Sequence, residues 1–435
     1  SLIQQLFNIP RFQDTVLNPP VITTPDVPLK MVEEFQQLFA SLTLSHKRSC
    51  DTTPFVLSIP GYDGGPIDPC VQWDCNEFFN MLFDRLENCY RGTPKQYILR
   101  EEFGGVFSQQ LICIGCPHSS NREDPFYSIS IETKNKENLL QGLDLFVEDE
   151  ILSGENAYKC DICNKKVDTR KRGAVHTPPT MLFLHLKRFD FDYEKMVNVK
   201  LNHRFSFPHS FDLEPYTVAG LARKDGMALN ELEIHEDAEW ITRKSHIYHL
   251  RGITIHVGMA DRGHYYSFLD KKRGRGGTKW VRFDDTKVQE FDPKDIPKEA
   301  FGGTETFRKY DKAKREYVKI NQTRSYNAYL LVYEHADADQ RREYLRNHKS
   351  RNQLLSSLSG ERVEEPQDVA VGEGEEDKEK DQGNEEEEVT PTSSSTPSST
   401  PSTQEEGSEK GEKVDKNNKI ENEKENEKEN EKENE

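Results

Sequence analysis

Two Cys-x-x-Cys pairs restrict the fold of this chain more than any other feature of its sequence. They are Cys113-Ile-Gly-Cys116 and Cys160-Asp-Ile-Cys163, separated by 43 residues. Each short turn places two thiolates on one side of an ion, so two such turns supply the four ligands of a tetrahedral Zn²⁺ site. No coordination position is left open, which indicates a structural site. The sequence therefore predicts that Zn²⁺ holds together a long excursion of the chain.

Other interpretations of the cysteines are weaker. A redox-active pair usually occurs once, near the start of a helix in a βαβ unit, and neither pair has that setting. Unligated buried thiols would explain one pair more readily than two. Eight cysteines in a long chain without a signal peptide favour free thiols and metal ligands over disulfides. The compartment is then reducing, and we expect the cytoplasm or the nucleus.

Apolar residues change their spacing along the chain. In the first hundred residues they recur at helical intervals, for example from Met31 to Leu42 and from Phe78 to Cys89. From about Phe103 onward they form short runs that are typical of strands. Helices followed by strands predict an α+β architecture. The expected strands are Val106–Ile114, Tyr127–Ile131, Met181–Phe191, His249–Val257, Tyr265–Asp270, Trp280–Asp284 and Tyr329–Tyr333.

Two stretches are expected to interrupt these strands. Val218–Lys244 is mixed and charged, and we expect a loop there. Phe301–Arg324 is rich in Lys and Arg and has a weak helical pattern.

The negative charge of the chain is concentrated near its C-terminal end. Residues 361–435 contain 27 acidic and 10 basic side chains, so they carry −17 of the formal net charge of −18. The remaining body is close to neutral and lacks the basic field that binds nucleic acid. No apolar run approaches the roughly 20 residues that span a bilayer. We therefore expect neither nucleic acid nor a membrane as a partner.

Residues 336–435 are expected to be a disordered tail. Beyond Glu334 the chain contains an acidic block, a Pro/Ser/Thr stretch and a Glu-Asn-Glu-Lys repeat that ends at Glu435. Such a composition buries too little apolar area to offset the entropy of the chain. Within His335–Ser359 a helix is compatible with the positions of Arg341, Tyr344, Leu345, Leu354 and Leu355.

A histidine and an aspartate are placed for acid–base chemistry. His264 begins a strand after the glycine-bounded loop Gly258–Gly263, and a later strand ends in Asp284 and Asp285. If the two strands form a hairpin, Asp284 returns to the level of His264, where it could hold Nδ1–H and stabilise the imidazolium. A histidine near an aspartate is more often structural, so this pair alone does not establish catalysis. His256 is a competitor without a carboxylate at the same offset, and no such pairing is found for His46, His118, His185 and His249.

Seven ordered motifs resemble those of the ubiquitin-specific protease family, and the resemblance covers most of residues 1–335. The first resembles the end of the cysteine box, the helix whose N-terminus carries the nucleophile in that family. Phe301–Asn327 further resembles an insertion of the subgroup of very large members. The motifs are Ser1–Phe7, Gln72–Phe78, the two cysteine pairs, Met181–Phe189, Gly263–Tyr265, Phe283–Asp285 and Asn327–Tyr333.

This resemblance implies a fold and a reaction for residues 1–335. The fold is that of a papain-like cysteine protease, with a helical thumb, an antiparallel palm sheet and zinc-ribbon fingers at about 105–180. The reaction is cleavage after the C-terminal glycine of ubiquitin, with His264 as the base and Asp284 and Asp285 as its acidic partners. Ubiquitin and ubiquitinated proteins would be the partners, Zn²⁺ the structural cofactor, and the domain a monomer. The ubiquitin tail would be bound by Asp74, Gln72, Gly263 and Tyr265.

By the same resemblance, the nucleophilic cysteine is expected four residues before Ser1, with an asparagine of the oxyanion hole nearby. Cys75 lies inside a helix where a small residue suffices for packing, and no other cysteine has a partner histidine. We therefore expect this chain to be inactive as it stands and to be a fragment of an active enzyme. Two alternatives remain open. One is a ubiquitin-binding scaffold without activity, and the other is a zinc-ribbon interaction protein without ubiquitin chemistry.

Overall fold

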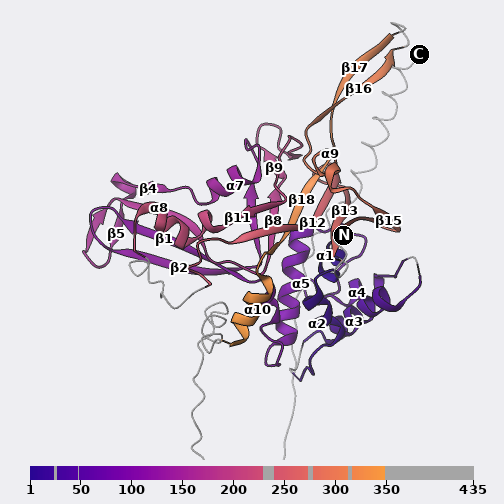
Figure 1. The fold of residues 1–435 in the computed structure, drawn as a ribbon, viewed down its shortest axis with the longest axis horizontal. Helices are drawn as coiled ribbons and strands as arrows, with labels where there is room; N and C mark the ends of the chain where they lie inside the picture. Colours follow the sequence, from indigo (N-terminus) through magenta and orange to yellow (C-terminus); the bar gives the residue numbers. More distant parts are fainter. Residues whose placement is uncertain (24–26, 48, 229–239, 273–277, 312–315, 348–435) are drawn as a thin grey trace, which may run out of the picture. The chain divides into compact units, whose positions relative to one another are not determined.

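The described part of the chain begins with helices and continues mainly as strands, in the order that the sequence predicts (Figure 1). The structure is a computed structural model that describes residues 1–23, 27–47, 49–228, 240–272, 278–311 and 316–347. These residues lie in one unit that extends from Ser1 to Pro366. None of the described helices is both long and apolar enough to cross a membrane. The first helices are α1 (Leu2–Phe7), α2 (Pro10–Leu17), α3 (Leu29–Leu44), α4 (Thr53–Ser58), α5 (Cys75–Tyr90) and α6 (Ile98–Phe103).

Helix α5 joins the helical part to a large sheet. It begins after Asp74, whose carboxylate accepts hydrogen bonds from the amides of Asn76 and Glu77 and so satisfies two free N–H groups of the helix end. Its apolar face is fully buried at Phe79 and Phe83. Phe83 stacks on Phe12 of α2, and Phe79 stacks on Phe183 of the sheet. Aromatic packing therefore fixes α5 between the two layers.

The large sheet has eight strands. They are β3 (Ser128–Glu132), β8 (Met181–Lys187), β11 (Ser210–Asp212), β12 (Ile247–Gly258), β13 (Gly263–Lys272), β14 (Thr278–Asp284), β15 (Lys287–Glu290) and β18 (Tyr326–His335). Their order is β15-β14-β13-β12-β18-β8-β3, and β11 pairs with β12. All neighbours are antiparallel except β3 and β8, so the expectation of an antiparallel sheet is wrong at this edge. The chain leaves the sheet after β3 and returns through a long excursion, which is the connection that parallel neighbours require.

A second sheet and a small hairpin form the excursion that was expected at about 105–180. The sheet has the order β2-β1-β7-β4, and Cys160 lies in the hairpin of β5 and β6. Strand β3 also lies between residues 105 and 180, but it belongs to the large sheet. The bounds are β1 (Gly105–Cys113), β2 (Ser119–Phe126), β4 (Glu150–Leu152), β5 (Tyr158–Cys160), β6 (Lys165–Val167), β7 (Thr169–Thr177) and, packed on β3, α7 (Leu139–Phe146).

The expected loop at Val218–Lys244 begins with a helix instead. Helix α8 (Val218–Asp225) is capped by the side chain of Thr217, which accepts a hydrogen bond from the amide of Gly220. It ends at Gly226, whose φ of +69° is the left-handed conformation that favours glycine at this position. The loop prediction was wrong because it rested on the charged composition of this stretch and not on the cap at Thr217 and the helix end at Gly226. Residues 229–239 lie outside the described residues.

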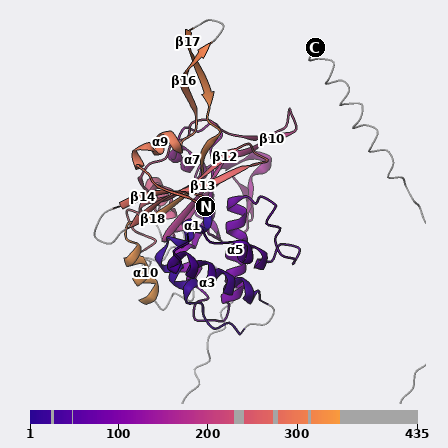
Figure 2. The same ribbon diagram turned by 90° about the vertical axis from the view of Figure 1, so that its right-hand side faces the viewer.

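The weak helical pattern expected at Phe301–Arg324 is also wrong. Strands β16 (Thr304–Asp311) and β17 (Glu316–Thr323) form a hairpin that pairs with no other described strand and extends away from the sheets (Figure 2). Apolar residues face each other across it, as in Phe307 and Ile320. A hairpin with no buried face lacks the alternation that predicts a strand. The remaining elements near the large sheet are β9 (Phe189–Asp192), β10 (Val197–Lys200) and α9 (Ile296–Glu299).

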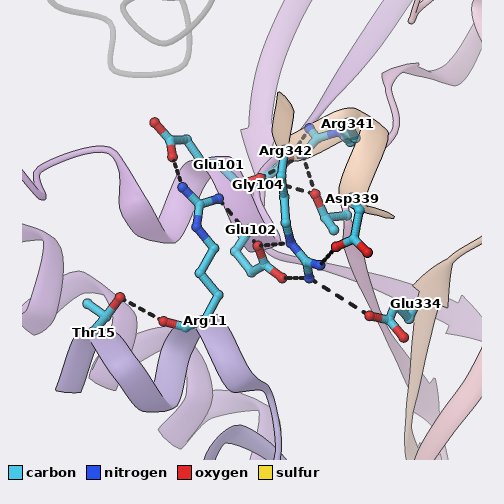
Figure 3. Close-up of polar contacts among 10 residues, drawn as sticks. Arg11, Thr15, Glu101, Glu102, Gly104, Glu334, Asp339, Arg341 and Arg342 are labelled. Carbon is cyan, nitrogen blue, oxygen red and sulfur yellow. Dashed lines mark hydrogen bonds and ion pairs between the residues drawn. The ribbon is translucent and has the colours of Figure 1, made fainter. Parts of the chain in front are cut away.

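The ordered body extends past residue 336, where the disordered tail was expected to begin. Helix α10 (Ala338–Asn347) buries Ala338, Arg341 and Leu345. Nη1 of Arg341 donates hydrogen bonds to the carbonyl of Glu101 and to Oγ1 of Thr180, both at 2.6 Å (Figure 3). The tail boundary was placed too early because a buried arginine does not register as a core residue in the hydropathy pattern. Residues 348–435 lie outside the described residues.

Ion pairs reinforce the position of α10. Arg342 pairs with Glu102 of α6, which is only 1% exposed, and Arg11 of α2 lies 3.4 Å from the same carboxylate (Figure 3). Arg342 also approaches Glu334 at the end of β18, at 3.8 Å. Helix α10 is therefore tied both to the first helices and to the large sheet.

Candidate active site

His264 and Asp284 meet where β13 begins and β14 ends. The two strands are antiparallel neighbours, as the sequence predicts. Nε2 of His264 lies 2.7 Å from Oδ1 of Asp284 and 3.9 Å from Oδ2 of Asp285. The side chain of His264 is 44% exposed. The structure thus brings the three predicted residues together at a position that solvent can reach.

The nitrogen of His264 that faces Asp284 is Nε2, so the predicted bond from Nδ1–H is wrong. The ring reaches across to the neighbouring strand with its outer nitrogen, and Nδ1 has no hydrogen-bond partner among the described residues. Burial raises the pKa of Asp284, but hydrogen bonds from His264 and Arg282 outweigh this effect and keep the pKa below its usual value. An ionised carboxylate only accepts hydrogen bonds, so Nε2 of His264 carries the proton and Nδ1 is the basic nitrogen.

Asp285 has a more peripheral place than Asp284. It adopts a φ of +50° in the turn that leads to β15, and its side chain is 78% exposed. Its carboxylate can therefore act on His264 only through the longer contact.

Gln72 holds the residue that precedes His264. Nε2 of Gln72 donates a hydrogen bond to the carbonyl of Gly263 at 2.6 Å, and its Oε1 accepts one from the amide of Gly263 at 3.1 Å. A side chain added at Gly263 would come within 2.2 Å of Nε2 of His256 and of the carbonyl of Val257, so only glycine fits. Gln72 was predicted to contact substrate. In this structure both the oxygen and the nitrogen of its amide are bonded to Gly263 of the chain itself.

Asp74 holds the residue that follows His264. Besides capping α5, its carboxylate accepts hydrogen bonds from the hydroxyl groups of Tyr265, at 3.4 Å, and Tyr329. Asp74 was predicted to contact substrate, and Tyr265 to line the channel for it. In this structure both oxygens of Asp74 are occupied by groups of the chain itself. The segment that leads into α5 therefore holds the backbone of Gly263 before His264 and the side chain of Tyr265 after it.

His256, the competing histidine, lies inside β12 and is 3% exposed. Burial lowers its pKa to about 4, and Nδ1 has no hydrogen-bond partner among the described residues. It packs against the rings of Phe189 and Tyr265. These are the properties of a core histidine.

No thiol is hydrogen-bonded to His264, although all eight cysteines lie in the described part of the chain. Cys75 is near the site, because it follows Asp74, whose carboxylate accepts a hydrogen bond from the hydroxyl of Tyr265. Its side chain is buried, which raises the pKa of the thiol to about 12. Burial likewise raises the pKa of Cys89 to about 11. Neither thiol has the low pKa of a nucleophile.

A separate group of metal-ligand side chains lies where β1 meets the β5–β6 hairpin. Cys116, Cys160, Cys163 and His118 place their ligand atoms within 4.8 Å of one another. Nδ1 of His118 lies 3.6 Å from Sγ of Cys160. Three thiols and an imidazole are a donor set that suits a tetrahedral divalent ion.

This group differs from the predicted set of four cysteines. Cys113 is hydrogen-bonded to the thiols of Cys116 and Cys160, so it lies against the group without being one of its four members. The amide of Cys113 donates to the carbonyl of His118, which folds His118 back toward the cysteines. His118 was missed because histidines were searched only for carboxylate partners. Its position two residues after Cys116 was the available signal.

Comparison with known proteins decides the family. The model of the family described as ubiquitin carboxyl-terminal hydrolase matches residues 1–333. The chain belongs to this family. Members of the ubiquitin carboxyl-terminal hydrolase family are deubiquitinating cysteine proteases, so the resemblance found in the sequence motifs is confirmed.

Relatives of this hydrolase domain include very large proteins. Ubiquitin carboxyl-terminal hydrolase 9X of Mus musculus is 38% identical over 283 residues, which are 63% of this chain and 11% of that protein. Ubiquitin carboxyl-terminal hydrolase 34 of Homo sapiens is 30% identical over 351 residues, which are 79% of this chain and 10% of that protein. The chain thus spans about a tenth of the length of these relatives.

Solved structures share the fold of this hydrolase domain. One is a SAGA DUB module, Ubp8/Sgf11/Sus1/Sgf73, bound to ubiquitin aldehyde, with a TM-score of 0.56 and 22% sequence identity. The match covers 78% of this chain and 67% of that chain. It supports the mixed helix and sheet architecture expected from the sequence.

Proposed function

We propose that this chain binds ubiquitin and carries the base and the acidic partner of a deubiquitinating cysteine protease. The observation that carries the proposal is the His264–Asp284 pair, with a distance of 2.7 Å between Nε2 and Oδ1 and with Nδ1 free. A half-exposed imidazole held by a carboxylate is the arrangement that a general base requires.

The proposed reaction needs a thiol at Nδ1 of His264, and we infer that this thiol is not among the eight cysteines of the sequence. When a thiol is supplied there, Nδ1 takes its proton and the thiolate attacks the carbonyl carbon of the C-terminal glycine of ubiquitin. Asp284 stabilises the imidazolium, whose Nδ1–H then protonates the departing lysine amine. A water molecule deprotonated by His264 finally releases ubiquitin from the thioester.

The start of α5 is our candidate for the contact with the C-terminal tail of ubiquitin. Solved relatives were determined with monoubiquitin or ubiquitin aldehyde bound. Asp74 is already bonded within the chain, whereas the side chain of Glu77 on the first turn of the same helix is exposed. Glu77 is thus free to pair with a basic residue of the tail, while Asp74 holds the helix in place.

Titration of ubiquitin into the recombinant chain by calorimetry tests the binding part of the proposal. We expect binding that weakens about tenfold in Glu77→Lys, since a charge pair becomes a repulsion. Glu343→Lys, on exposed α10 surface, makes the same charge change as a control. No binding by the wild-type chain would overturn the proposal and favour a zinc-ribbon interaction protein.

Hydrolysis of a ubiquitin C-terminal fluorogenic amide tests the inference about the thiol. We expect the chain as given to bind ubiquitin and to leave this amide intact. Hydrolysis that disappears in one of the eight single Cys→Ser variants would show that the nucleophile is present after all. The second candidate function, a ubiquitin-binding scaffold, is favoured by the same lack of a thiol at His264. The scaffold function would be excluded if a form of the protein hydrolysed the amide and lost this activity in His264→Gln.

We further propose that the group around Cys160 binds structural zinc. The amide of Ile114 donates to the carbonyl of Asp168 at 2.7 Å, so the first cysteine turn is bonded to the residue between β6 and β7, five positions after Cys163. Metal analysis should find one zinc per chain and a loss of zinc in Cys160→Ser. Cys70→Ser, at an exposed cysteine away from the group, is the matched control. A zinc-free chain that remains folded would overturn this proposal.

A further inference from the structure

Arg282 lies beside the His264–Asp284 pair, and the reaction described above gives it no role. We propose that Arg282 is a positioning residue. By occupying Oδ2 of Asp284, it keeps Oδ1 turned toward the Nε2–H of His264 and so holds the imidazole where Nδ1 is left as the basic nitrogen. This inference rests on the proposed function, because the orientation of the pair matters only if His264 acts as a base.

Strand geometry places four side chains on one face of the sheet. His264 and Tyr266 are two residues apart in β13, and Arg282 and Asp284 are two apart in β14, so the members of each pair project from the same side of their strand. Arg282 is directly opposite Phe268 in the register, which puts both pairs on the same face. The sequence patterns His-x-Tyr and Arg-x-Asp therefore build one row of contacts across the two strands.

Arg282 is held from two sides. Its Nη2 donates a hydrogen bond to Oδ2 of Asp284 at 2.8 Å. The carbon at the centre of its guanidinium lies 4.2 Å from the ring centroid of Tyr266, which is only 3% exposed. A cation above a buried aromatic ring is held more firmly than an exposed surface pair. The two oxygens of Asp284 consequently have different and fixed partners.

This arrangement has a consequence that a purely structural salt bridge would not have. In Asp284→Asn, the guanidinium of Arg282 can only donate, so it requires the amide oxygen. The NH₂ group then faces His264 and donates to Nε2, which moves the ring proton to Nδ1. Arg282 would thus turn a nearly isosteric change into a switch to the unreactive tautomer. Without Arg282, the amide is free to present its oxygen to His264.

The test is to determine which ring nitrogen of His264 carries the proton, by ¹⁵N NMR of the histidine-labelled full chain at a pH where the imidazole is neutral. Comparison with His264→Gln identifies the signal. We expect Nε2–H in the wild type and in Arg282→Lys, and Nδ1–H in Asp284→Asn. Arg282→Met alone should keep Nε2–H, because either oxygen of the Asp284 carboxylate can only accept, and in Asp284→Asn/Arg282→Met at least half of the Nε2–H form should return. Lys279→Met, on the opposite face of β14, is the matched control and should leave the wild-type spectrum.

The positioning role is wrong if Asp284→Asn gives the same tautomer with and without Arg282→Met. It is also wrong if Asp284→Asn retains pure Nε2–H. The ubiquitin titration of the wild-type chain keeps the two proposals apart. A wild type that does not bind ubiquitin would overturn the proposed function and leave the NMR result about Arg282 unchanged.

Discussion

Two pairs of side chains built on histidine, His246–His335 and His264–Asp284, differ in burial and in partner. His246 and His335 are 0% and 2% exposed, and Nδ1 of His246 lies 3.2 Å from Nε2 of His335. The amide of Asp337 donates to Nδ1 of His335 at 3.0 Å, so Nε2 of His335 carries the proton and donates to His246. Burial lowers the pKa to about 4 for His246 and about 3 for His335.

The difference shows what separates a structural histidine from a reactive one. Both nitrogens of His335 are bonded within the chain, next to α10, and neither bond is to a carboxylate that could stabilise the protonated ring. In the other pair a carboxylate holds one nitrogen of His264 and leaves the second one free. Burial without a counter-charge makes an imidazole a fixed neutral hydrogen-bonding group, whereas partial exposure beside a carboxylate makes it a base. Each prediction below tests one side of this contrast.

The largest expected effect is on stability, in the buried surroundings of the His246–His335 pair. Arg341 of α10 is 2% exposed. It donates hydrogen bonds to Thr180 and to the main-chain carbonyls of Glu101 and Gly104. Replacing it in Arg341→Met leaves these acceptors buried without a donor. We expect a loss of about 3 to 5 kcal/mol in the free energy of unfolding, measured by urea denaturation.

The matched control is Glu343→Met, an exposed position on the same helix, which should change the free energy by less than about 0.5 kcal/mol. A loss below about 1 kcal/mol in Arg341→Met would show that α10 is not part of the cooperative unit. In that case the surroundings of the His246–His335 pair would be no more rigid than those of the His264–Asp284 pair.

The next effect is a dependence of stability on pH. Between pH 6.5 and about 4 the unfolded chain binds protons at His246 and His335 that the folded chain does not bind. Stability therefore rises with pH across this window and is lost as the pH falls, by up to about 1.4 kcal/mol per pH unit for each histidine. The charged groups around the two rings are Arg223, Arg243, Arg341, Asp212 and His249.

Urea titrations at pH 6.5, 5.5 and 4.5 measure this slope. In His335→Gln, the glutamine amide can still donate to His246, and we expect the slope to fall by about a quarter, because burial also lowers the pKa of His185, His246 and His256 to about 4. His46→Gln, at an exposed position after α3, should leave the slope as in the wild type. An unchanged slope in His335→Gln would mean that other groups cause the acid instability.

The sequence predicted the parts of the fold that are buried on one side. Six of the seven expected strands were confirmed because their apolar residues face the core, and the helices expected at Met31–Leu42 and Phe78–Cys89 were confirmed for the same reason. The seventh strand, Met181–Phe191, is divided at Arg188 into β8 and β9, which lie in different sheets. The β16–β17 hairpin was missed because neither of its faces is buried. Helix α10 was missed as part of the body because its central buried residue is an arginine. Hydrophobic periodicity detects burial only when the buried groups are apolar.

The candidate site was predictable in its members but not in its contacts. His264, Asp284 and Asp285 come together as expected, since a hairpin returns the end of one strand to the start of the other. The choice of Nε2, the contact of Asp284 with Arg282 and the internal use of Gln72 depend on side-chain directions that spacing does not reveal. His118 is folded toward the cysteines by a main-chain bond at Cys113, and its position two residues after Cys116 was the sign of this in the sequence.

The smallest expected effect on folding belongs to the open side of the contrast. Gln72→Ala removes two hydrogen bonds to Gly263 at an exposed position, so we expect a loss of only about 1 kcal/mol in the free energy of unfolding. The amide of Gly263 loses its acceptor, and its hydrogen exchange should become about tenfold faster, since an exposed amide that is no longer hydrogen-bonded opens more readily. Gln289→Ala, at an exposed glutamine of β15, is the control for both measurements. If exchange at Gly263 stays slow in Gln72→Ala, the loop before His264 is held by β12 alone, and the start of α5 has no part in placing the base.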